Sequence, residues 1–281
     1  MNPQSATSRK TRRTVFFVSD GTAITTETLG HSLLTQFPEV EFQQERLPFV
    51  DDMAAAAEAV TRINEASSRD GAPAIVFNTI VNEDLCDIIH RSDGITLDLF
   101  ATFLGPLERA LGMQHLPTVG QAHGVSNLQR YEDRMEATNY AMNHDDGLSI
   151  DFKDADLILV GVSRSGKTPT CLYMALHFGV KAANYPLTPE DLDQMRLPPF
   201  LRRHKRKIAG LMIEPERLAQ IRENRKPGSR YASLRQCRQE VEAAESLLRM
   251  EGIPVFLTTH SSIEEIASRV LLQLGLQREM F

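Results

Sequence analysis

The sequence predicts an α/β protein built from two successive domains, each with a parallel β-sheet covered by helices. Short apolar runs of strand length alternate with amphipathic helical stretches, a pattern typical of parallel strands with helices on both sheet faces. A glycine-rich motif follows one of these runs beyond the middle of the chain, at a strand-to-helix junction. The 281 residues are enough for two domains with cores of their own.

The first half of the chain alternates between the two patterns. The run "TVFFVS" is brief, apolar and rich in β-branched and aromatic residues, which indicates a buried strand. The next stretch, "ITTETLGHSLLTQF", has helical spacing of its apolar residues, and an Ala-rich helix begins at Asp51, where carboxylates suit the positive end. The predicted order is strand 14–19, helix 24–37, a strand within 40–50, helix 51–66 and strand 73–80.

The second half repeats this alternation. The predicted strands are 156–161, 206–213 and 253–259, and "AANYP" ends a further one; the predicted helices are 215–224, 232–250 and 262–275. The polar, turn-rich segment 112–130 is predicted to be a linker or a long functional loop. We therefore expect a disordered tail over residues 1–13, an N-terminal α/β domain over 14–150 and a second domain over 151–281.

Composition excludes several classes of protein. The chain is 42% hydrophobic and 24% charged, as in ordinary soluble globular proteins, and its net charge of −6 disfavours nonspecific nucleic-acid binding. No apolar run is long enough to span a membrane, and residues 1–13 lack the apolar core of a secretion signal. The three cysteines, Cys86, Cys171 and Cys237, lie far apart, which favours a reducing, cytoplasmic location and argues against a zinc site.

The motif at residues 161–168 fits the phosphate-binding P-loop pattern G-x-x-x-x-G-K-[ST]. Glycines let successive backbone N–H groups turn toward a phosphate, and the following helix presents its N-terminus to the same anion. An apolar strand precedes the loop and an apolar helix follows it, as the motif requires. The predicted nucleotide-binding residues are Gly161, Val162, Ser163, Arg164, Ser165, Gly166, Lys167 and Thr168; Lys167 supplies a positive charge and Thr168 a hydroxyl for Mg²⁺.

The surroundings of the motif favour a kinase among P-loop proteins. The guanine-reading N-K-x-D motif of GTPases does not occur, and the strand that should end in an ATPase aspartate ends at Glu214. Small kinases instead neutralise the transferring phosphoryl group with arginines from a mobile lid. The Arg-rich stretch 217–238 suits that role, so residues 151–281 are predicted to form a P-loop kinase-like α/β domain.

Two acidic motifs are candidates for a catalytic base. "NHDDG" places Asp145 and Asp146 beside a histidine at the end of a helical run, where they could accept a proton or bind a metal. The alternative is a helix C-terminus and turn, stopped by Gly147. Asp20 follows the first strand, where α/β proteins bind ligands, although a Ser-Asp-Gly at such a place more often only caps the next helix.

Taken in order, these motifs resemble one family: the regulatory proteins of phosphoenolpyruvate synthase and of pyruvate, phosphate dikinase. The resemblance covers residues 14–281 and rests on "VSDGTAITTETLGHSLLTQFP", "HDDG", "LVGVSRSGKTPT", "AANYP", "PERLAQIRENR" and "RYASLRQCR". "SDGTA" and the Gly-Lys-Thr ending of the P-loop look like the synthase branch. A plastid transit segment is also absent from this sequence.

The resemblance implies a bifunctional enzyme that acts on phosphoenolpyruvate synthase in its phosphohistidine form. It would phosphorylate a threonine of that target with ADP as donor, which inactivates the target. It would remove the phosphate with inorganic phosphate as acceptor, releasing pyrophosphate. Both reactions involve a diphosphate, which one P-loop could hold, with Lys167 and Mg²⁺ on Thr168 neutralising the moving charge. Asp146 or Asp145 is the expected base, with Asp20 in reserve, and residues 14–150 would recognise the target.

Two other functions fit the same P-loop. One is a kinase for a small metabolite, and the other is a nucleotide-sensing regulator that binds ADP and a partner without chemistry. Transfer of label to a protein, to a metabolite or to nothing separates the three. A homodimer is the expected assembly, as for many soluble enzymes.

Overall fold

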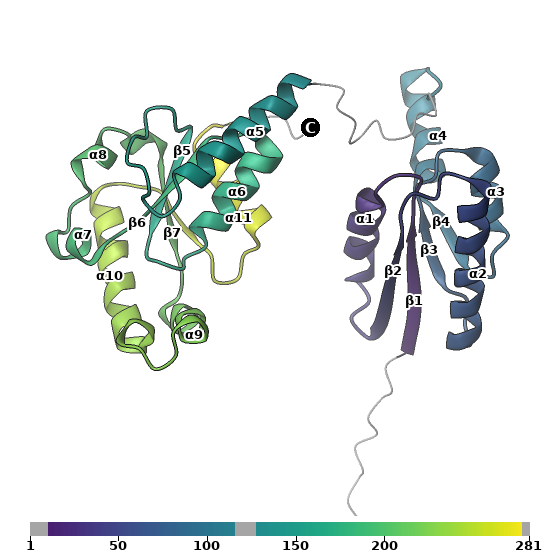
Figure 1. Cartoon of the computed structure of the whole chain (residues 1–281), viewed down its shortest axis with the longest axis horizontal. Coiled ribbons are helices and arrows are strands. Elements are labelled where there is room, and N and C mark those ends of the chain that lie inside the picture. The colour runs from purple at the N-terminus through teal and green to yellow at the C-terminus, as the bar shows by residue number, and fades with distance from the viewer. Residues whose placement is uncertain (1–10, 116–127, 277–281) are drawn as a thin grey trace, which may run out of the picture. The chain divides into compact units, whose positions relative to one another are not determined.

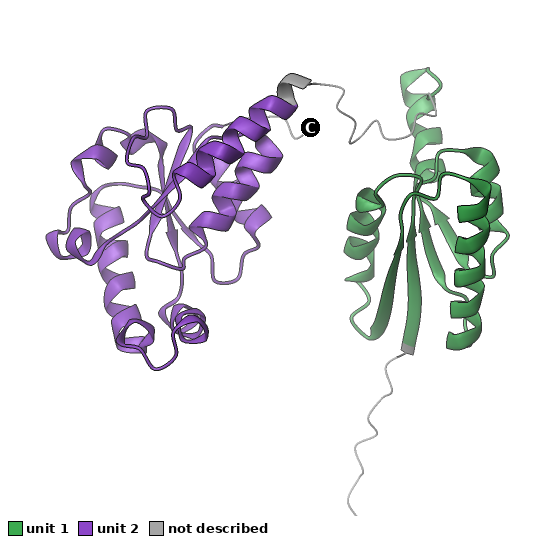
Figure 2. Ribbon diagram, in the orientation of Figure 1, with its two compact units in different colours: residues 1–124 green, residues 125–281 purple. Residues whose placement is uncertain are grey.

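The computed structural model describes residues 11–115 and 128–276 and divides the chain into two compact units, residues 1–124 and 125–281 (Figures 1 and 2). Each unit has its own sheet and its own buried core. Within the described ranges, no helix is both long and apolar enough to cross a lipid bilayer.

Unit 1 is a four-stranded parallel sheet with helices on both faces, in the strand order β2-β1-β3-β4. Its strands are β1 (Thr11–Val18), β2 (Val40–Leu47), β3 (Ile75–Asn78) and β4 (Ile95–Asp98). Its helices are α1 (Ile24–Leu34), α2 (Met53–Asp70), α3 (Glu83–His90) and α4 (Leu99–Leu111). Alternation along β1 sends Phe16 toward α2 and α3 and Phe17 toward α1, so both faces of the sheet are buried (Figure 1).

Unit 2 has the same topology, with the strand order β6-β5-β7-β8 and all strands parallel. Its strands are β5 (Leu157–Gly161), β6 (Ala182–Pro186), β7 (Ile208–Met212) and β8 (Val255–Leu257). Its α-helices are α5 (Leu128–Asn143), α6 (Lys167–Phe178), α7 (Pro189–Gln194), α8 (Pro199–Arg202), α9 (Pro215–Arg225), α10 (Leu234–Met250) and α11 (Ile263–Gln273). Two short 3₁₀ helices, η1 (Lys205–Lys207) and η2 (Arg230–Ala232), complete it.

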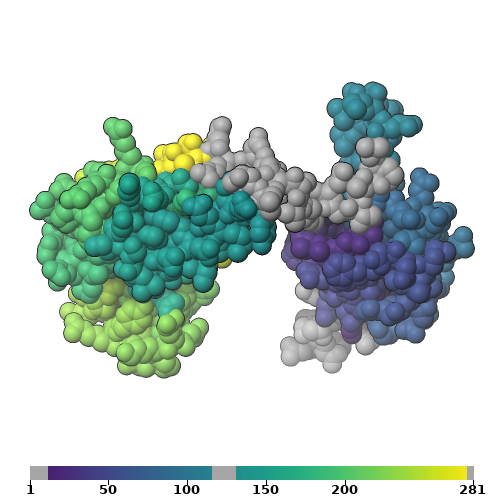
Figure 3. Space-filling model, turned by 45° about the horizontal axis from the view of Figure 1, so that its top comes forward, coloured from purple at the N-terminus to yellow at the C-terminus, as the bar shows by residue number. Residues whose placement is uncertain are grey.

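The central strand β5 is buried on both sides, which explains its unbroken apolar sequence. Leu157 and Leu159 pack against α5, α6 and α11, whereas Ile158 and Val160 pack against the helices of the opposite face, chiefly α10. Figure 1 shows these two helical layers, and Figure 3 shows α5, coloured teal, on the surface of unit 2. The two-sided burial fixes the end of β5, and with it the P-loop.

The structure confirms the α/β class and the parallel sheets and corrects some boundaries. The units divide after Gly124 rather than near residue 150, because α5 packs against α6 and β6 of the second unit. β1 begins at Thr11, so residues 11–13 are strand rather than tail, because they pair with β2. Residues 1–10 of the predicted tail, and 116–127 of the predicted linker, lie outside the described residues.

Candidate functional site

The P-loop connects the end of β5 to α6, as the motif predicts. Its two glycines are required for different reasons. A Cβ on Gly161 would lie 2.2 Å from the carbonyl oxygen of Leu211, so the neighbouring strand leaves no room for a side chain. Gly166 has open space around it, but its φ of +89° at the N-cap of α6 is a conformation that L side chains rarely adopt. Arg164 also has positive φ, at +78°.

The start of α6 offers partners for an anion. The first N–H groups of a helix have no intrahelical acceptor and lie at the positive end of its dipole. The Ser165 hydroxyl is buried and has no hydrogen-bond partner in the structure. A buried hydroxyl without a partner costs about 1–3 kcal/mol, which a bound oxyanion would recover. The loop therefore fits a phosphate group.

Lys167, the first residue of α6, is only 3% exposed and its Nζ donates a hydrogen bond to the carbonyl of Val162 at 3.0 Å. Burial lowers the pKa of this ammonium group to about 8, although the nearby Asp146 and Asp145 carboxylates oppose that shift. A desolvated ammonium group inside the loop is a strong electrostatic partner for phosphate oxygens.

The "HDDG" turn follows α5 and lies against the P-loop. The Thr168 hydroxyl donates to Asp145 Oδ1 at 2.6 Å, which joins the motif's last residue to this turn. The buried Asn184, from β6, holds both aspartates: its Nδ2 donates to Asp145 Oδ1 at 2.5 Å, and its Oδ1 accepts from the Asp146 N–H at 3.0 Å. Asp146 has a positive φ of +46°, so the chain turns sharply between the two carboxylates.

His144 is held by its own surroundings. Its ring stacks on Tyr140 with centroids 3.9 Å apart, and its nitrogens lie 2.9 and 3.0 Å from the backbone oxygens of Tyr140 and Asp151. The backbone carbonyl of His144 accepts from the N–H of Asn184 at 3.1 Å. This histidine therefore anchors the turn to β6.

The two carboxylates have different surroundings. Asp145 is half-buried and hydrogen-bonded to Thr168 and Asn184, whereas Asp146 is exposed. Both follow the C-terminal, negative end of α5, where a cation is stabilised. Oxygen ligands are those that Mg²⁺ prefers, and the neighbouring Thr168 hydroxyl and Asp145 carboxylate fit this ion. Asp146 remains accessible to an incoming proton donor.

The prediction of an arginine lid is wrong for Arg222. This side chain is completely buried, forms an ion pair with Glu240 at 2.7 Å and lies 4.0 Å from the ring centre of Tyr231. Its NH2 group donates to the carbonyl of Ser163 at 3.1 Å, and the Tyr231 hydroxyl lies 3.1 Å from Ser163 Oγ. The sequence "PERLAQIRENR" thus forms helix α9, whose buried Arg222 supports the P-loop through the carbonyl of Ser163.

Asp20 lies in unit 1 and is nearly buried. Its Oδ2 accepts a hydrogen bond from the N–H of Val81 at 2.7 Å, which ties the loop after β1 to the loop after β3. It does not cap α1, whose N-cap is Ala23 without a side-chain hydrogen bond.

Sequence reasoning did not identify Asn184 and Tyr231 as site residues. Asn184 is the one polar side chain within the buried half of β6, and its position next to the P-loop strand was the available signal. Tyr231 gave no comparable signal, because its contact with Ser163 depends on the packing of η2.

Comparison with known proteins gives a consistent result. The family model described as kinase/pyrophosphorylase matches residues 15–271. A protein of Stenotrophomonas maltophilia is 55% identical over 271 residues, 96% of this chain and 99% of the relative. Proteins of Azoarcus sp. and Marinobacter nauticus are 53% and 51% identical over 268 residues, 95% of this chain and 97% and 99% of those relatives. All three are named "Putative phosphoenolpyruvate synthase regulatory protein". This chain belongs to the kinase/pyrophosphorylase family.

Proposed function

We propose that this protein is a bifunctional regulator of phosphoenolpyruvate synthase that acts in the cytoplasm. In one direction it transfers the β-phosphoryl group of ADP to a threonine of the synthase, which inactivates the synthase. In the other it transfers that phosphoryl group to inorganic phosphate, which restores the synthase. The names of the relatives support the target, and the family description supports a phosphoryl-transfer chemistry in two directions.

The observation that carries this proposal is the junction of the P-loop with the "HDDG" turn. The Thr168 hydroxyl donates to Asp145 Oδ1 at 2.6 Å. The buried ammonium group of Lys167 lies near the carboxylates of Asp145 and Asp146. A phosphate-binding loop alone is compatible with simple nucleotide sensing. A loop with paired carboxylates, one hydrogen-bonded and one accessible, has the groups that phosphoryl transfer needs.

Each residue has a distinct role in this proposal. The backbone of residues 161–168 and the Ser165 hydroxyl bind the diphosphate, and Lys167 lies against its oxygens. Thr168 and Asp145 would hold Mg²⁺, which supplies charge neutralisation when bound. Asp146 accepts the threonine proton in the kinase direction and returns it in the phosphorylase direction.

The two reactions balance with one set of groups. In the kinase direction the threonine oxygen bonds to the β-phosphorus of ADP, the bond to the α-phosphate oxygen breaks, and AMP leaves. In the phosphorylase direction an oxygen of inorganic phosphate attacks the phosphothreonine phosphorus, and the threonine oxygen leaves with a proton. The product of that second reaction is pyrophosphate, so both reactions have a diphosphate that the P-loop can bind.

Unit 1 has no role in binding the diphosphate in this proposal, and we assign it to recognition of the synthase in its phosphohistidine form. A kinase for a small metabolite would not need so large an additional unit. We expect the protein to act as a homodimer, which light scattering on the purified chain would measure.

The direct experiment incubates the protein with the phosphohistidine form of phosphoenolpyruvate synthase, β-labelled ADP and Mg²⁺. The proposal predicts label on a threonine of the synthase, with AMP as the second product. Label on a small metabolite would indicate a metabolite kinase, and binding without transfer would indicate a nucleotide sensor. Transfer of the γ-label from ATP would indicate an ordinary kinase. Any of these three outcomes would contradict the proposal.

A further inference from the structure

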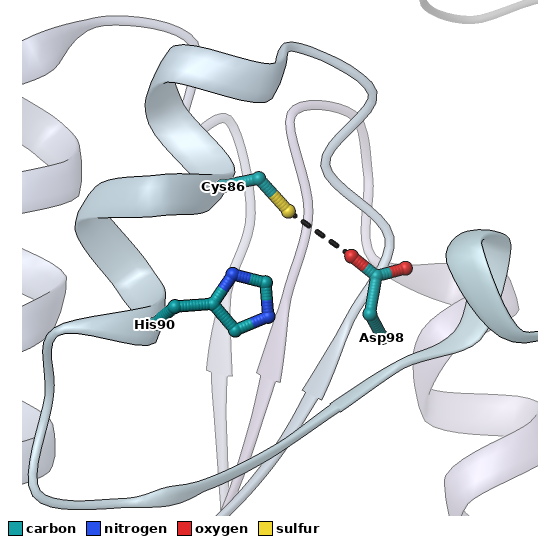
Figure 4. A group of neighbouring side chains, drawn as sticks. All are labelled: Cys86, His90 and Asp98. Atoms are coloured by element: carbon teal, nitrogen blue, oxygen red, sulfur yellow. Dashed lines mark hydrogen bonds between the residues drawn. The ribbon is translucent and has the colours of Figure 1, made fainter.

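A second group of reactive side chains lies in unit 1, apart from the P-loop. Cys86 and His90 are one turn apart on α3, and Asp98 ends the neighbouring strand β4. One ligand atom from each, a sulfur, a ring nitrogen and a carboxylate oxygen, lies within 4.8 Å of the other two. Figure 4 shows the three side chains directed into a common space between the helix and the strand. Among the described residues, this is the one set of three such groups that converges so closely.

We propose that Cys86, His90 and Asp98 bind a divalent cation of the zinc class. Thiolate, imidazole and carboxylate together are the ligand set that Zn²⁺ takes, and three protein ligands leave a fourth position for water or an exogenous ligand. Mg²⁺ prefers oxygen ligands alone and would not select this site. The site is therefore chemically distinct from the Thr168–Asp145 pair in unit 2.

The spacing needs little adjustment. Zinc bonds to sulfur, nitrogen and oxygen ligands measure about 2.0–2.3 Å, so a tetrahedral ion keeps its ligands roughly 3.3–3.8 Å apart. Cys86 Sγ already lies 3.0 Å from Asp98 Oδ2, and the exposed His90 has a ring nitrogen within 4.8 Å of both atoms. Residues four apart on a helix share one face, which is why α3 presents the thiol and the imidazole together.

The surroundings are organised for a ligand role. The buried Asn78, from β3, donates through Nδ2 to Cys86 Sγ at 2.9 Å and to Asp98 Oδ2 at 3.4 Å, which orients both ligands from behind. The two oxygens of Asp98 divide their tasks: Oδ1 caps α4 by accepting from the N–H of Ala101 at 2.8 Å, and Oδ2 faces the cluster. The helix cap thus fixes the carboxylate without consuming its second oxygen.

Without an ion, the thiol keeps its proton. Burial and the adjacent Asp98 carboxylate raise the pKa of Cys86 to about 12, and its S–H donates to that carboxylate. A bound divalent cation reverses this balance, because coordination deprotonates a thiol. The ion would replace one hydrogen bond with three coordinate bonds and tie α3 to the end of β4.

Cysteine spacing in the sequence did not predict this site. Cys86, Cys171 and Cys237 have no mutual ligand spacing, which argued against zinc, but a mixed site needs one cysteine only. The site also lies at the carboxyl ends of β3 and β4, where parallel α/β sheets place their ligands.

The test uses the full chain with Zn²⁺, and with Co²⁺ as a spectroscopic probe, in excess Mg²⁺. The proposal predicts one tightly bound zinc per chain after dialysis and, with Co²⁺, a thiolate-to-cobalt charge-transfer band. His90→Gln, at an exposed position, and Cys86→Ser should each lower zinc affinity by at least about tenfold. Cys86→Ser should also abolish the band. The matched control His31→Gln, an exposed histidine of α1, should leave both unchanged.

Thermal unfolding provides an independent readout, since an ion bound only to the folded state raises the melting temperature. Zinc should raise it for the wild type and His31→Gln but not for the two ligand variants. Wild-type protein that binds no zinc at micromolar concentration would overturn the proposal. Equal zinc binding in wild type and either ligand variant would overturn it as well. Neither result would bear on ADP-dependent transfer at the P-loop.

Discussion

Asp145 and Asp146 are adjacent in the sequence, yet they lie in different chemical surroundings. Asp145 accepts hydrogen bonds from Thr168 and Asn184, and these donors hold it against the P-loop. Asp146 contributes its backbone N–H to Asn184 and leaves its carboxylate exposed. One buried asparagine therefore separates a fixed carboxylate from an accessible one. This difference is the reason for assigning the metal to Asp145 and the proton to Asp146.

The first prediction concerns Asp146. Asp146→Asn keeps the shape of the side chain and removes the proton acceptor. Kinase turnover should therefore fall by about 10²–10⁴-fold, the rate acceleration that a general base typically contributes. ADP affinity, measured by calorimetry, should change little. Asp193→Asn, an exposed aspartate on α7, serves as the control and should behave like the wild type. Turnover within a few-fold of the wild type in Asp146→Asn would contradict the assignment of Asp146 as the base.

The second prediction concerns the pH dependence of ADP binding. Lys167 has a folded-state pKa of about 8, below its ordinary value of 10.5, so its charge is lost as the pH rises through 8. ADP affinity should therefore weaken above pH 8, by up to about tenfold per pH unit. The sign for stability is opposite: the protonated, buried lysine costs stability below pH 8, and that cost declines between pH 8 and 10.5.

Lys167→Met provides the comparison for this prediction. This variant should bind ADP weakly at every pH, and its ADP affinity should no longer fall as the pH rises through 8. It should also be no less stable than the wild type at pH 7, because a desolvated charge has been removed. A wild-type affinity that stays constant between pH 7 and 9.5 would show that Lys167 is not the group that titrates.

At the scale of elements, α9, η2 and α10 form a brace behind the P-loop. Arg222 joins the three: it emerges from α9, lies over Tyr231 of η2 and pairs with Glu240 of α10. It also reaches the loop itself through the carbonyl of Ser163. Arginine suits this position because its planar group donates in several directions while its face packs on an aromatic ring.

The third prediction separates the two tasks of this brace. Arg222→Met leaves Glu240 without its partner and should lower the free energy of unfolding by about 3–5 kcal/mol, as measured in urea. Combining it with Glu240→Leu removes the unpaired charge and should recover most of that loss. The Ser163 carbonyl still lacks its donor, so the double variant should bind ADP more weakly than the wild type. Wild-type ADP affinity in the double variant would contradict the bracing role.

The fourth prediction compares the two glycines of the loop. Gly161→Ala places a methyl group against the Leu211 carbonyl and should prevent β5 from pairing normally with β7, with a large loss of thermal stability. Gly166→Ala meets no atoms and should cost only about 1–2 kcal/mol for its left-handed backbone conformation. Calorimetric melting of both variants measures the difference. Equal losses of thermal stability in the two variants would contradict this account, in which the nearby Leu211 carbonyl is the reason that position 161 requires glycine.

At the scale of the whole molecule, the sequence predicted what depends on local pattern. The alternating strands and helices, the parallel sheets and the strand–loop–helix junction at residues 157–178 follow from periodicity and motif, and the structure confirms them. The hydrophobic pattern did not predict β4. This short edge strand has half-exposed apolar residues that do not form a continuous run. The boundary was misplaced because α5 belongs to unit 2 through packing, which its sequence does not reveal.

In the candidate site, too, the local motifs were predicted from sequence, whereas the contacts made by packing were not. The motif predicted the loop, Lys167 and Thr168, and the two carboxylates of "HDDG" were recognised as chemically unusual. That Asp145 meets Thr168 could not be predicted, because residues 23 positions apart come together only through the pairing of β5 with β6 and the packing of α5. The role of Arg222 was misjudged because an arginine-rich stretch on a lid and one in a buried brace look alike in sequence.

The central claim is that one P-loop serves both directions of phosphoryl transfer, and the phosphorylase half-reaction tests it most directly. Phosphoenolpyruvate synthase carrying a labelled phosphothreonine is mixed with inorganic phosphate and either wild-type protein or Lys167→Met, and released pyrophosphate is measured. We predict that the label leaves as pyrophosphate with the wild type, that ADP inhibits this release competitively with phosphate, and that Lys167→Met loses both directions in parallel. Normal pyrophosphate release by a Lys167→Met variant that has lost its kinase activity would contradict the claim.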